Sequence, residues 1–215
     1  MILSFDGNKL ISKLEIIPNI VFNDTPNGLS SLYTYDASIL RCVVVSRITK
    51  IKNLIFLVHV FSKIDFPCIL DIYGPVEDKN YFSTLFDSVG ELPKNVKFEY
   101  KGHLESSRVS EVISLYDLFL FPTFGENFGH VVFEALSAGT PIIISPNTPW
   151  DEESSKAIFV CDLIPDIWVT KMSEFYNMKY FDVMSIRTES MLSARNFEDK
   201  NSKDSSRLID FFNSL

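Results

Sequence analysis

The chain has 215 residues, of which 46% are hydrophobic and 22% are charged, and its formal net charge is −8 at pH 7. This length favours one globular domain and is too short for two domains of usual α/β size. The acidic balance argues against a nonspecific nucleic-acid or anionic-membrane surface. No apolar run approaches the roughly 20 residues that span a bilayer, and the first residues lack the basic start and apolar core of a secretory signal. We therefore expect a soluble, cytoplasmic protein.

Short apolar runs alternate with segments of helical periodicity along most of the chain. The expected strands lie at residues 42–46, 68–73, 96–100, 118–121, 142–145 and 157–161. The expected helices between them lie at residues 54–61, 81–89, 109–115 and 128–138. Strands that are apolar on both faces and alternate with helices predict an α/β fold: a Rossmann-like parallel sheet with helices on both faces.

The two ends of the chain are less regular. Residues 14–17 could form a strand, and a polar, turn-rich stretch follows at residues 23–31. Helical periodicity returns near the C-terminus at residues 167–175, 181–195 and 206–215, with a polar run at Lys200–Ser206 that we interpret as a loop before the last helix. The expected organisation is a linker-like segment with at most one strand at residues 1–40, a Rossmann-like domain at 41–175, and helices packing on it at 176–215.

Several candidate site residues follow the expected strands. Arg47, Gly74, Gly102 and Glu126 all fall where a strand ends, and ligands of parallel α/β sheets bind at this edge. Lys52 begins the next helix, five positions after Arg47. The two cations are interpreted either as solvated surface charges or as an anion site, where arginine grips phosphate oxygens in a fork and lysine supplies a point charge. Their position at a strand end favours the anion site.

Two carboxylates, Glu126 and Glu134, lie eight positions apart around an expected helix start. Glu134 lies among apolar neighbours, where a bare carboxylate is costly to bury, so we expect a polar group to meet it. The backbone amides of Gly129, His130 and Val131 could bind phosphate at the helix N-terminus. The alternative is a plain helix start capped by Asn127.

Histidines and cysteines give weaker signals. His103 follows a strand end and His130 opens the key helix, so both are site candidates, whereas His59 within a helix is interpreted as structural. Cys42, Cys68 and Cys161 lie at apolar runs and are expected to be buried, reduced thiols. The sequence shows no Ser-His-Asp order, Walker loop or Cys/His metal cluster, so hydrolysis by a catalytic triad is not expected.

At this point the residues resemble the C-terminal nucleotide-sugar-binding domain of retaining GT-B glycosyltransferases of the family-4 type, the glycosyl transferases group 1. The resemblance runs from about residue 18 to residue 150 and is weaker beyond. The segments that carry it are, in chain order, Ser46-Arg47-Ile48, Lys52-Asn53, Leu70-Asp71-Ile72-Tyr73-Gly74, Val96-Lys97-Phe98, Tyr116–Thr123 and the Glu, seven residues, Glu signature from Glu126 to Glu134.

The resemblance implies a role for each matching residue. Arg47 and Lys52 would hold the donor diphosphate and stabilise the leaving nucleoside diphosphate, and Glu126 would face the donor sugar, so these three are the catalytic candidates. Glu134 would accept hydrogen bonds from the ribose, and Gly102 and His103 would lie near the base. The implied donor-binding residues are Glu134, Phe128, Gly129, His130, Val131, Gly74, Gly102 and His103. Enzymes of this type generally need no metal, so the resemblance implies no metal and no cofactor, with the nucleotide sugar as a donor substrate.

The chain also departs from the family pattern. Ser46 replaces the usual glycine before the arginine, Ile51 replaces the usual acid before the lysine, and Pro75 and Val76 follow Gly74 where a second glycine is usual. In the family an acceptor-binding domain precedes the matching region, which would leave this chain as the C-terminal half of a GT-B enzyme. It is then a truncated reading frame, an excised domain or one subunit of a split transferase.

The resemblance also implies a setting. It points to a hexosyltransferase of cell-surface polysaccharide assembly, such as lipopolysaccharide or capsule, with a nucleotide sugar and a separate acceptor domain or subunit as partners. We expect no nucleic-acid partner, and membrane contact only indirectly, at the inner face, through a lipid-linked acceptor or a partner. The alternatives are a noncatalytic interaction subunit, which the 19 phenylalanines would suit by leaving apolar surface, and a nucleotide-sugar epimerase of similar architecture.

Overall fold

The computed structural model describes residues 33–90, 92–152 and 155–213. The chain divides into two units, one of residues 24–196 and one of residues 1–23 with 197–215. All of the sheet and the candidate site belong to the first unit. The strand expected at 14–17 and the turn-rich stretch at 23–31 lie outside the described residues.

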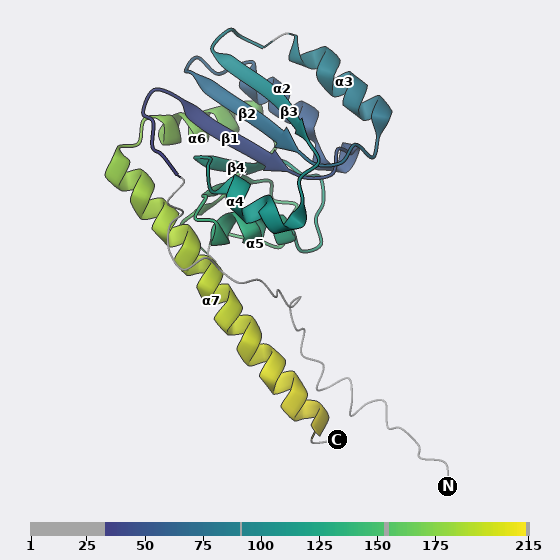
Figure 1. The fold of residues 1–215 in the computed structure, drawn as a ribbon, viewed down its shortest axis with the longest axis vertical. Helices are drawn as coiled ribbons and strands as arrows, with labels where there is room; N and C mark the ends of the chain where they lie inside the picture. Colours follow the sequence, from purple (N-terminus) through teal and green to yellow (C-terminus); the bar gives the residue numbers. More distant parts are fainter. Residues whose placement is uncertain (1–32, 91, 153–154, 214–215) are drawn as a thin grey trace. The chain divides into compact units, whose positions relative to one another are not determined.

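Strands and helices alternate along the described chain, as the hydrophobic pattern predicts (Figure 1). The elements are β1 (Leu40–Val45), η1 (Lys50–Lys52), α2 (Leu54–Phe61), β2 (Cys68–Tyr73), α3 (Lys79–Val89), β3 (Val96–Gly102), η2 (Ser106–Arg108), α4 (Val109–Ile113), β4 (Leu118–Phe121), α5 (His130–Ser137), β5 (Ile142–Ile144), β6 (Ile158–Val160), α6 (Pro165–Tyr176) and α7 (Tyr180–Asn213).

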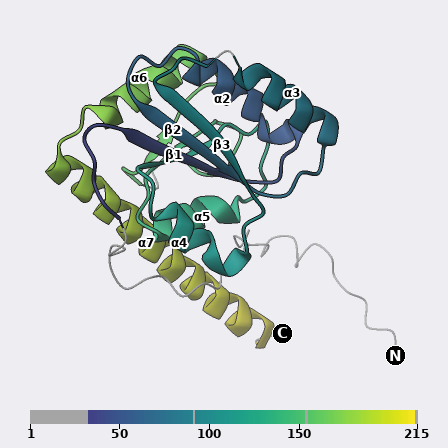
Figure 2. The ribbon, with the colours of Figure 1, turned by 45° about the horizontal axis from the view of Figure 1, so that its top comes forward.

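The strands form one parallel sheet in the order β3-β2-β1-β4-β5-β6. The order reverses between β1 and β4, which pair at Cys42 with Leu118 and at Val43 with Phe119. The helices that follow β1 and β4, α2 and α5, lie on opposite faces of the sheet (Figure 2), and such a switch point is where open α/β sheets bind ligands. The predicted Rossmann-like fold class is confirmed.

Helices cover both faces of the sheet (Figure 2). On one face, apolar side chains of β1, β2 and β4 pack against α2, α3 and α6 in a continuous core that includes the fully buried Leu57, Phe61 and Trp168. On the other face lie α4 and α5. Phe119 and Phe121 of β4 and Phe133 of α5 are fully buried. Burial of this apolar surface is the main force that fixes the strand ends at one edge.

The C-terminal region differs from the sequence prediction. We expected two helices at 181–195 and 206–215 separated by a loop at Lys200–Ser206, but the backbone is helical without a break from Tyr180 to Asn213. The segment contains no glycine or proline, and the polar residues of the run lower helix propensity only slightly. The predicted loop at Lys200–Ser206 is therefore wrong, because a polar run without glycine or proline can continue a helix. In the described part of the chain, no helix is both long and apolar enough to cross a membrane.

Candidate functional site

The carboxyl ends of β1 and β4 and the start of α5 surround an open pocket of about 270 Å³. Six of the residues singled out in the sequence line it: Arg47, Lys52, Glu126, Gly129, His130 and Val131. Val45, Ser46 and Phe121 complete the lining and were not identified as site residues from the sequence. They are the last residue of β1, the residue after it and the last residue of β4, so their position at strand ends was the available signal.

Lys52 and Glu126 form an ion pair at the centre of this lining. Lys52 Nζ donates to Glu126 Oε2 at 2.7 Å and lies 5.0 Å from the centre of the Phe121 ring. Only 9% of the Lys52 side chain and 21% of the Glu126 side chain are exposed. A cation so little solvated needs this partner, which fixes the ammonium group in the pocket.

Glu126 is held by its own loop as well as by Lys52. Its Oε1 accepts a 3.0 Å hydrogen bond from the backbone N–H of Asn127, and its own N–H donates to the carbonyl of Asn147 at 3.0 Å. Burial acts to raise the pKa of Glu126, but the Lys52 charge and hydrogen bond, with the amides of Asn127 and Phe128, outweigh it and lower the pKa. Glu126 is therefore ionised near neutral pH and accepts hydrogen bonds.

Arg47 has a more open environment than Lys52. Its Nη1 lies 3.1 Å from both carboxylate oxygens of Glu77, in the loop after β2. The Arg47 side chain is 59% exposed, so its guanidinium can turn toward a ligand in the pocket at little cost. The pocket thus has one largely buried cation, Lys52, and one exposed cation, Arg47.

The start of α5 is shaped by Gly129 rather than by Asn127. Gly129 has φ +78° and is the N-cap, and no side chain caps the helix, so the alternative in which Asn127 caps it is wrong. The left-handed backbone at Gly129 also explains why the helix starts at His130 and not at Phe128. A Cβ at this position would meet Glu126 Cγ at 3.2 Å and Val132 Cγ2 at 3.3 Å.

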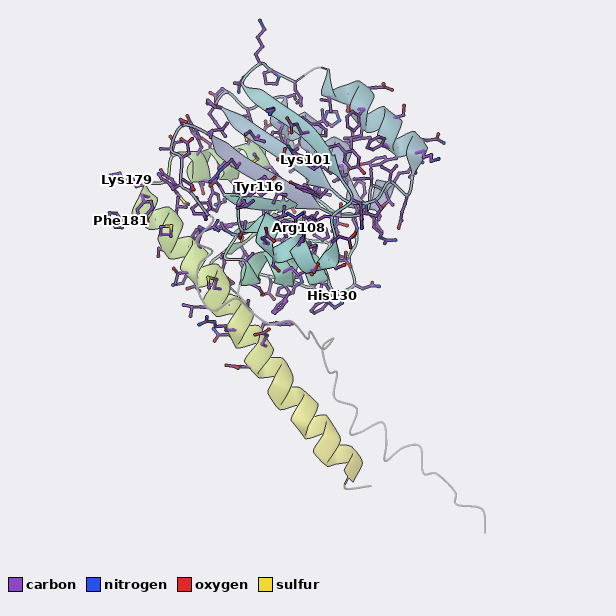
Figure 3. All side chains as sticks on the ribbon, in the orientation of Figure 1. Lys101, Arg108, Tyr116, His130, Lys179 and Phe181 are labelled. Atoms are coloured by element: carbon purple, nitrogen blue, oxygen red, sulfur yellow. The ribbon has the colours of Figure 1, made fainter. Side chains whose placement is uncertain are left out.

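Phe128 packs beneath the surface next to this turn and does not line the pocket. It is buried, its ring lies 4.7 Å from that of His130 and 5.7 Å from that of Trp150, and its carbonyl accepts a hydrogen bond from Trp150 Nε1 at 2.5 Å. His130 itself is exposed at the first position of α5 (Figure 3). Phe128 and Trp150 therefore hold the turn that presents the α5 amides.

Glu134 does not line the pocket but lies on the same side of α5. His130 and Val131 precede it by four and three positions, which places the three side chains on one helix face. Its carboxylate is half-buried, and within the described residues no group donates to it. Burial raises its pKa to about 7. No described residue supplies the polar partner that the sequence analysis expected for Glu134. Part of the Glu134 population is instead protonated, and therefore uncharged, near neutral pH.

The remaining predicted residues lie outside the pocket at neighbouring strand ends. Gly74 has φ +136°, and a Cβ there would lie 1.8 Å from the carbonyl oxygen of Ser46, so glycine is required for the packing of two loops. Gly102 has φ +81° with open space around it, and its carbonyl accepts from the N–H of Gly74 at 2.8 Å. His103 is exposed, with Nε2 3.8 Å from Glu105 Oε1. These residues form a second group beside the pocket.

Other candidates have structural or no site roles. The three cysteines are buried free thiols, as expected, and His59 is exposed on α2 and does not line the pocket. Among the described residues no group of three or more His, Cys, Asp or Glu side chains is arranged to hold a metal ion. The pocket can therefore bind an anion through Arg47 and Lys52, accept hydrogen bonds at its carboxylate and donate hydrogen bonds from the backbone amides of α5.

Comparison with known proteins agrees with this geometry. Residues 40–157, more than half of the chain, match the family model described as glycosyl transferases group 1. No curated protein sequence matches the chain significantly.

Solved structures show the same fold. The catalytic domain of cholesterol-α-glucosyltransferase from Helicobacter pylori matches with a TM-score of 0.60 and 18% identity, over 74% of this chain and 98% of that one. Anabaena Alr3699/HepE in complex with UDP and glucose matches with a TM-score of 0.68 and 15% identity, over 83% of this chain and 49% of that one. TarM matches with a TM-score of 0.71 and 14% identity, over 97% of this chain and 42% of that one. The chain thus spans about half or less of the HepE and TarM chains, and the fold is that of GT-B C-terminal domains.

Proposed function

The chain belongs to the glycosyl transferases group 1 family, and from this premise we propose that it is the donor domain of a glycosyltransferase that binds a nucleotide-diphosphate sugar. The observation that carries the proposal is the pocket where Arg47, Lys52 and the start of α5 converge. Two cations and free helix amides favour phosphate, and nearby carboxylates favour sugar hydroxyls. A nucleotide sugar offers both. Structures of HepE contain UDP with glucose, or UDP-glucose, which supports the proposal by analogy of fold.

In this proposal each side chain contacts a different part of the nucleotide sugar. Arg47 and Lys52 hold the diphosphate and offset the negative charge that develops as the nucleoside diphosphate leaves. Glu134 accepts from ribose hydroxyls, Glu126 contacts the donor sugar, and the group at Gly74, Gly102 and His103 lies toward the base. Because its pKa is lowered, Glu126 is a poor general base. We therefore propose transfer with retention, as in family-4 enzymes, without assigning either carboxylate as the base.

The acceptor side of the reaction belongs to a further domain or subunit in this proposal. Residues 41–175 form the donor domain, and residues 176–196 pack on it through contacts such as those of Arg187 with the carbonyls of Tyr116 and Ser114. The whole enzyme transfers a hexose without a metal ion, because Arg47 and Lys52 supply the positive charge. Its setting is cytoplasmic, in cell-surface polysaccharide assembly, with membrane contact through a lipid-linked acceptor or a partner. The family match favours this transferase over an epimerase.

Titration with UDP and GDP tests the proposal. We expect saturable binding of one of them by calorimetry, and at least tenfold weaker binding by Arg47→Ala and Glu134→Ala. His59→Ala, which changes an exposed side chain away from the pocket, is the matched control and should bind like the wild type.

The competing function is a noncatalytic interaction module. Phe124 and Phe181, which are 59% and 82% exposed, favour it because they give apolar surface for a partner. If the folded wild-type protein binds neither UDP nor GDP in a saturable way, the noncatalytic interaction module is the better interpretation.

A further inference from the structure

The loops after β1 and β2 run side by side beyond the end of the sheet. Ile48 and Val76 form a parallel bridge, the N–H of Ile48 donates to the carbonyl of Pro75 at 2.8 Å, and the N–H of Asp78 donates to the carbonyl of Ile48 at 3.1 Å. This pairing extends the β1–β2 register into the site. In this register Arg47 lies opposite Pro75, and its side chain reaches diagonally to Glu77, the residue after the bridge.

Glu77 is fixed in this position from its C-terminal side as well. Asp78 is the N-cap of α3 and its Oδ1 accepts from the N–H of Tyr81 at 2.9 Å. Glu77 is thus held between a backbone bridge and a helix cap, and its carboxylate meets Arg47 Nη1 at 3.1 Å with both oxygens. The backbone on either side of Glu77 is therefore fixed, and the contact itself is made by two exposed side chains.

The two cations of the pocket are therefore each neutralised by a carboxylate, but to different degrees. The Lys52–Glu126 pair is largely buried, whereas the side chains of Arg47 and Glu77 are 59% and 43% exposed. An exposed ion pair is weak and exchanges readily for a stronger partner, and a phosphate offers arginine more charge than a carboxylate. A diphosphate in the pocket would compete with Glu77 for the Arg47 guanidinium.

We propose that Glu77 is a specificity-determining residue that sets the affinity of the site for diphosphate by holding Arg47 until the ligand displaces it. This rests on the proposed function for the identity of the ligand. Glu77 neutralises one of the two cations when no diphosphate is bound, so a singly charged anion gains little by displacing it. A diphosphate engages Arg47 and Lys52 together, and this gain in binding free energy exceeds the cost of displacing Glu77.

The test is a double-mutant cycle with Glu77→Gln and Arg47→Ala, with inorganic pyrophosphate, UDP and GDP as probes in calorimetry. Glu77→Gln should bind pyrophosphate about two- to fivefold more tightly than the wild type, the range expected for loss of an exposed competing ion pair. The gain should vanish in the Arg47→Ala background and shrink at high salt. Glu174→Gln, which removes an exposed charge of the same type on α6, should leave the affinity unchanged.

The outcomes separate this inference from the proposed function. Unchanged or weaker pyrophosphate binding by Glu77→Gln, or a gain that persists without Arg47, would overturn the role of Glu77 even if UDP or GDP binds. Pyrophosphate binding that follows the cycle, with neither nucleotide bound, supports the role of Glu77 and contradicts a nucleotide-sugar site. Absence of binding of pyrophosphate, UDP and GDP by every variant overturns both.

Discussion

Lys52 Nζ lies 2.7 Å from Glu126 Oε2, and this contact joins the loop after β1 to the loop after β4. The buried Thr123 reinforces the junction, because its hydroxyl lies 3.0 Å from the carbonyl of Ile51 and 2.8 Å from that of Gly125. The N–H of Phe124 also donates to the carbonyl of Ile51 at 2.8 Å. The two loops at the switch point of the sheet therefore form one hydrogen-bonded unit, and Glu126 orients Lys52 within it.

Removing the Glu126 carboxylate should destabilise the protein through Lys52. Glu126→Ala leaves a largely buried ammonium without its partner, and we expect the free energy of unfolding to fall by about 3 kcal/mol. Glu126→Gln keeps an oxygen that can accept from Lys52 and should cost clearly less. Urea unfolding of both variants measures the difference. Equal losses would show that the charge pair is not what matters.

The raised pKa of Glu134 predicts a pH-dependent contribution to stability. Its pKa is about 7 in the folded protein and 4.5 in the absence of burial, so the folded state favours the protonated form. The contribution of Glu134 to the free energy of unfolding is fully present below pH 4.5 and is lost as pH rises through 7. The free energy of unfolding of the wild type, relative to Glu134→Gln, should therefore be higher at pH 5 than at pH 8. A difference that does not change with pH would contradict this prediction.

Nucleotide binding should reverse that preference. Ribose hydroxyls donate hydrogen bonds most strongly to an ionised carboxylate, so a bound nucleoside diphosphate should lower the pKa of Glu134 from about 7. Binding at pH 6.5 should then release protons from Glu134. Calorimetry in buffers of different ionisation enthalpy measures this release, and Glu134→Gln is the control that removes it. Equal proton release by both proteins would rule out Glu134 as the ribose ligand.

Two glycines at adjacent strand ends should respond differently to alanine. Gly102→Ala places a Cβ in open space and is strained only by φ +81°, so it should cost about 1–2 kcal/mol of stability. Gly74→Ala adds a collision with the Ser46 carbonyl at 1.8 Å and should cost at least about 3 kcal/mol. Thermal and urea unfolding of the pair check the order. Similar losses would mean that the two loops can separate without penalty.

Arg187 on α7 should be a strong determinant of stability although it lies away from the pocket. It is fully buried, its Nη1 and Nη2 donate to the carbonyls of Tyr116 and Ser114 at 2.7 and 2.8 Å, and it stacks 3.6 Å from the Tyr33 ring centre. Burial lowers its pKa to about 10, so it remains charged at neutral pH. Arg187→Ala should cost about 3 kcal/mol, because both carbonyls lose their donor.

Arg187→Lys is the informative companion variant. It keeps the charge, but a single ammonium group cannot reproduce the planar fork that reaches both carbonyls. We expect it to recover only part of the loss in urea unfolding. Full recovery would show that charge alone, and not the fork, holds α7 to the end of α4.

Much of the fold was predictable because its signals are local. Apolar runs of strand length, helical periodicity and the glycines at strand ends are properties of neighbouring residues, and the elements expected between residues 42 and 161 were found with small shifts at their ends. The start of α5 was missed by two positions because the sequence does not show which glycine of the loop takes the left-handed conformation that Gly129 has before the helix. The unbroken α7 was missed because a polar run was interpreted as a loop.

The sequence by itself determined that Arg47, Lys52, Glu126 and the start of α5 would share one edge of a parallel sheet, since each follows a strand and parallel strands end together. Only the tertiary structure decided their partners. Lys52 meets Glu126 across 74 positions of the chain and Arg47 meets Glu77 across 30, because the order β3-β2-β1-β4 brings these loops side by side. It also decided that the two carboxylates of the signature differ, with the pKa of Glu126 lowered by a cation and the pKa of Glu134 raised by burial.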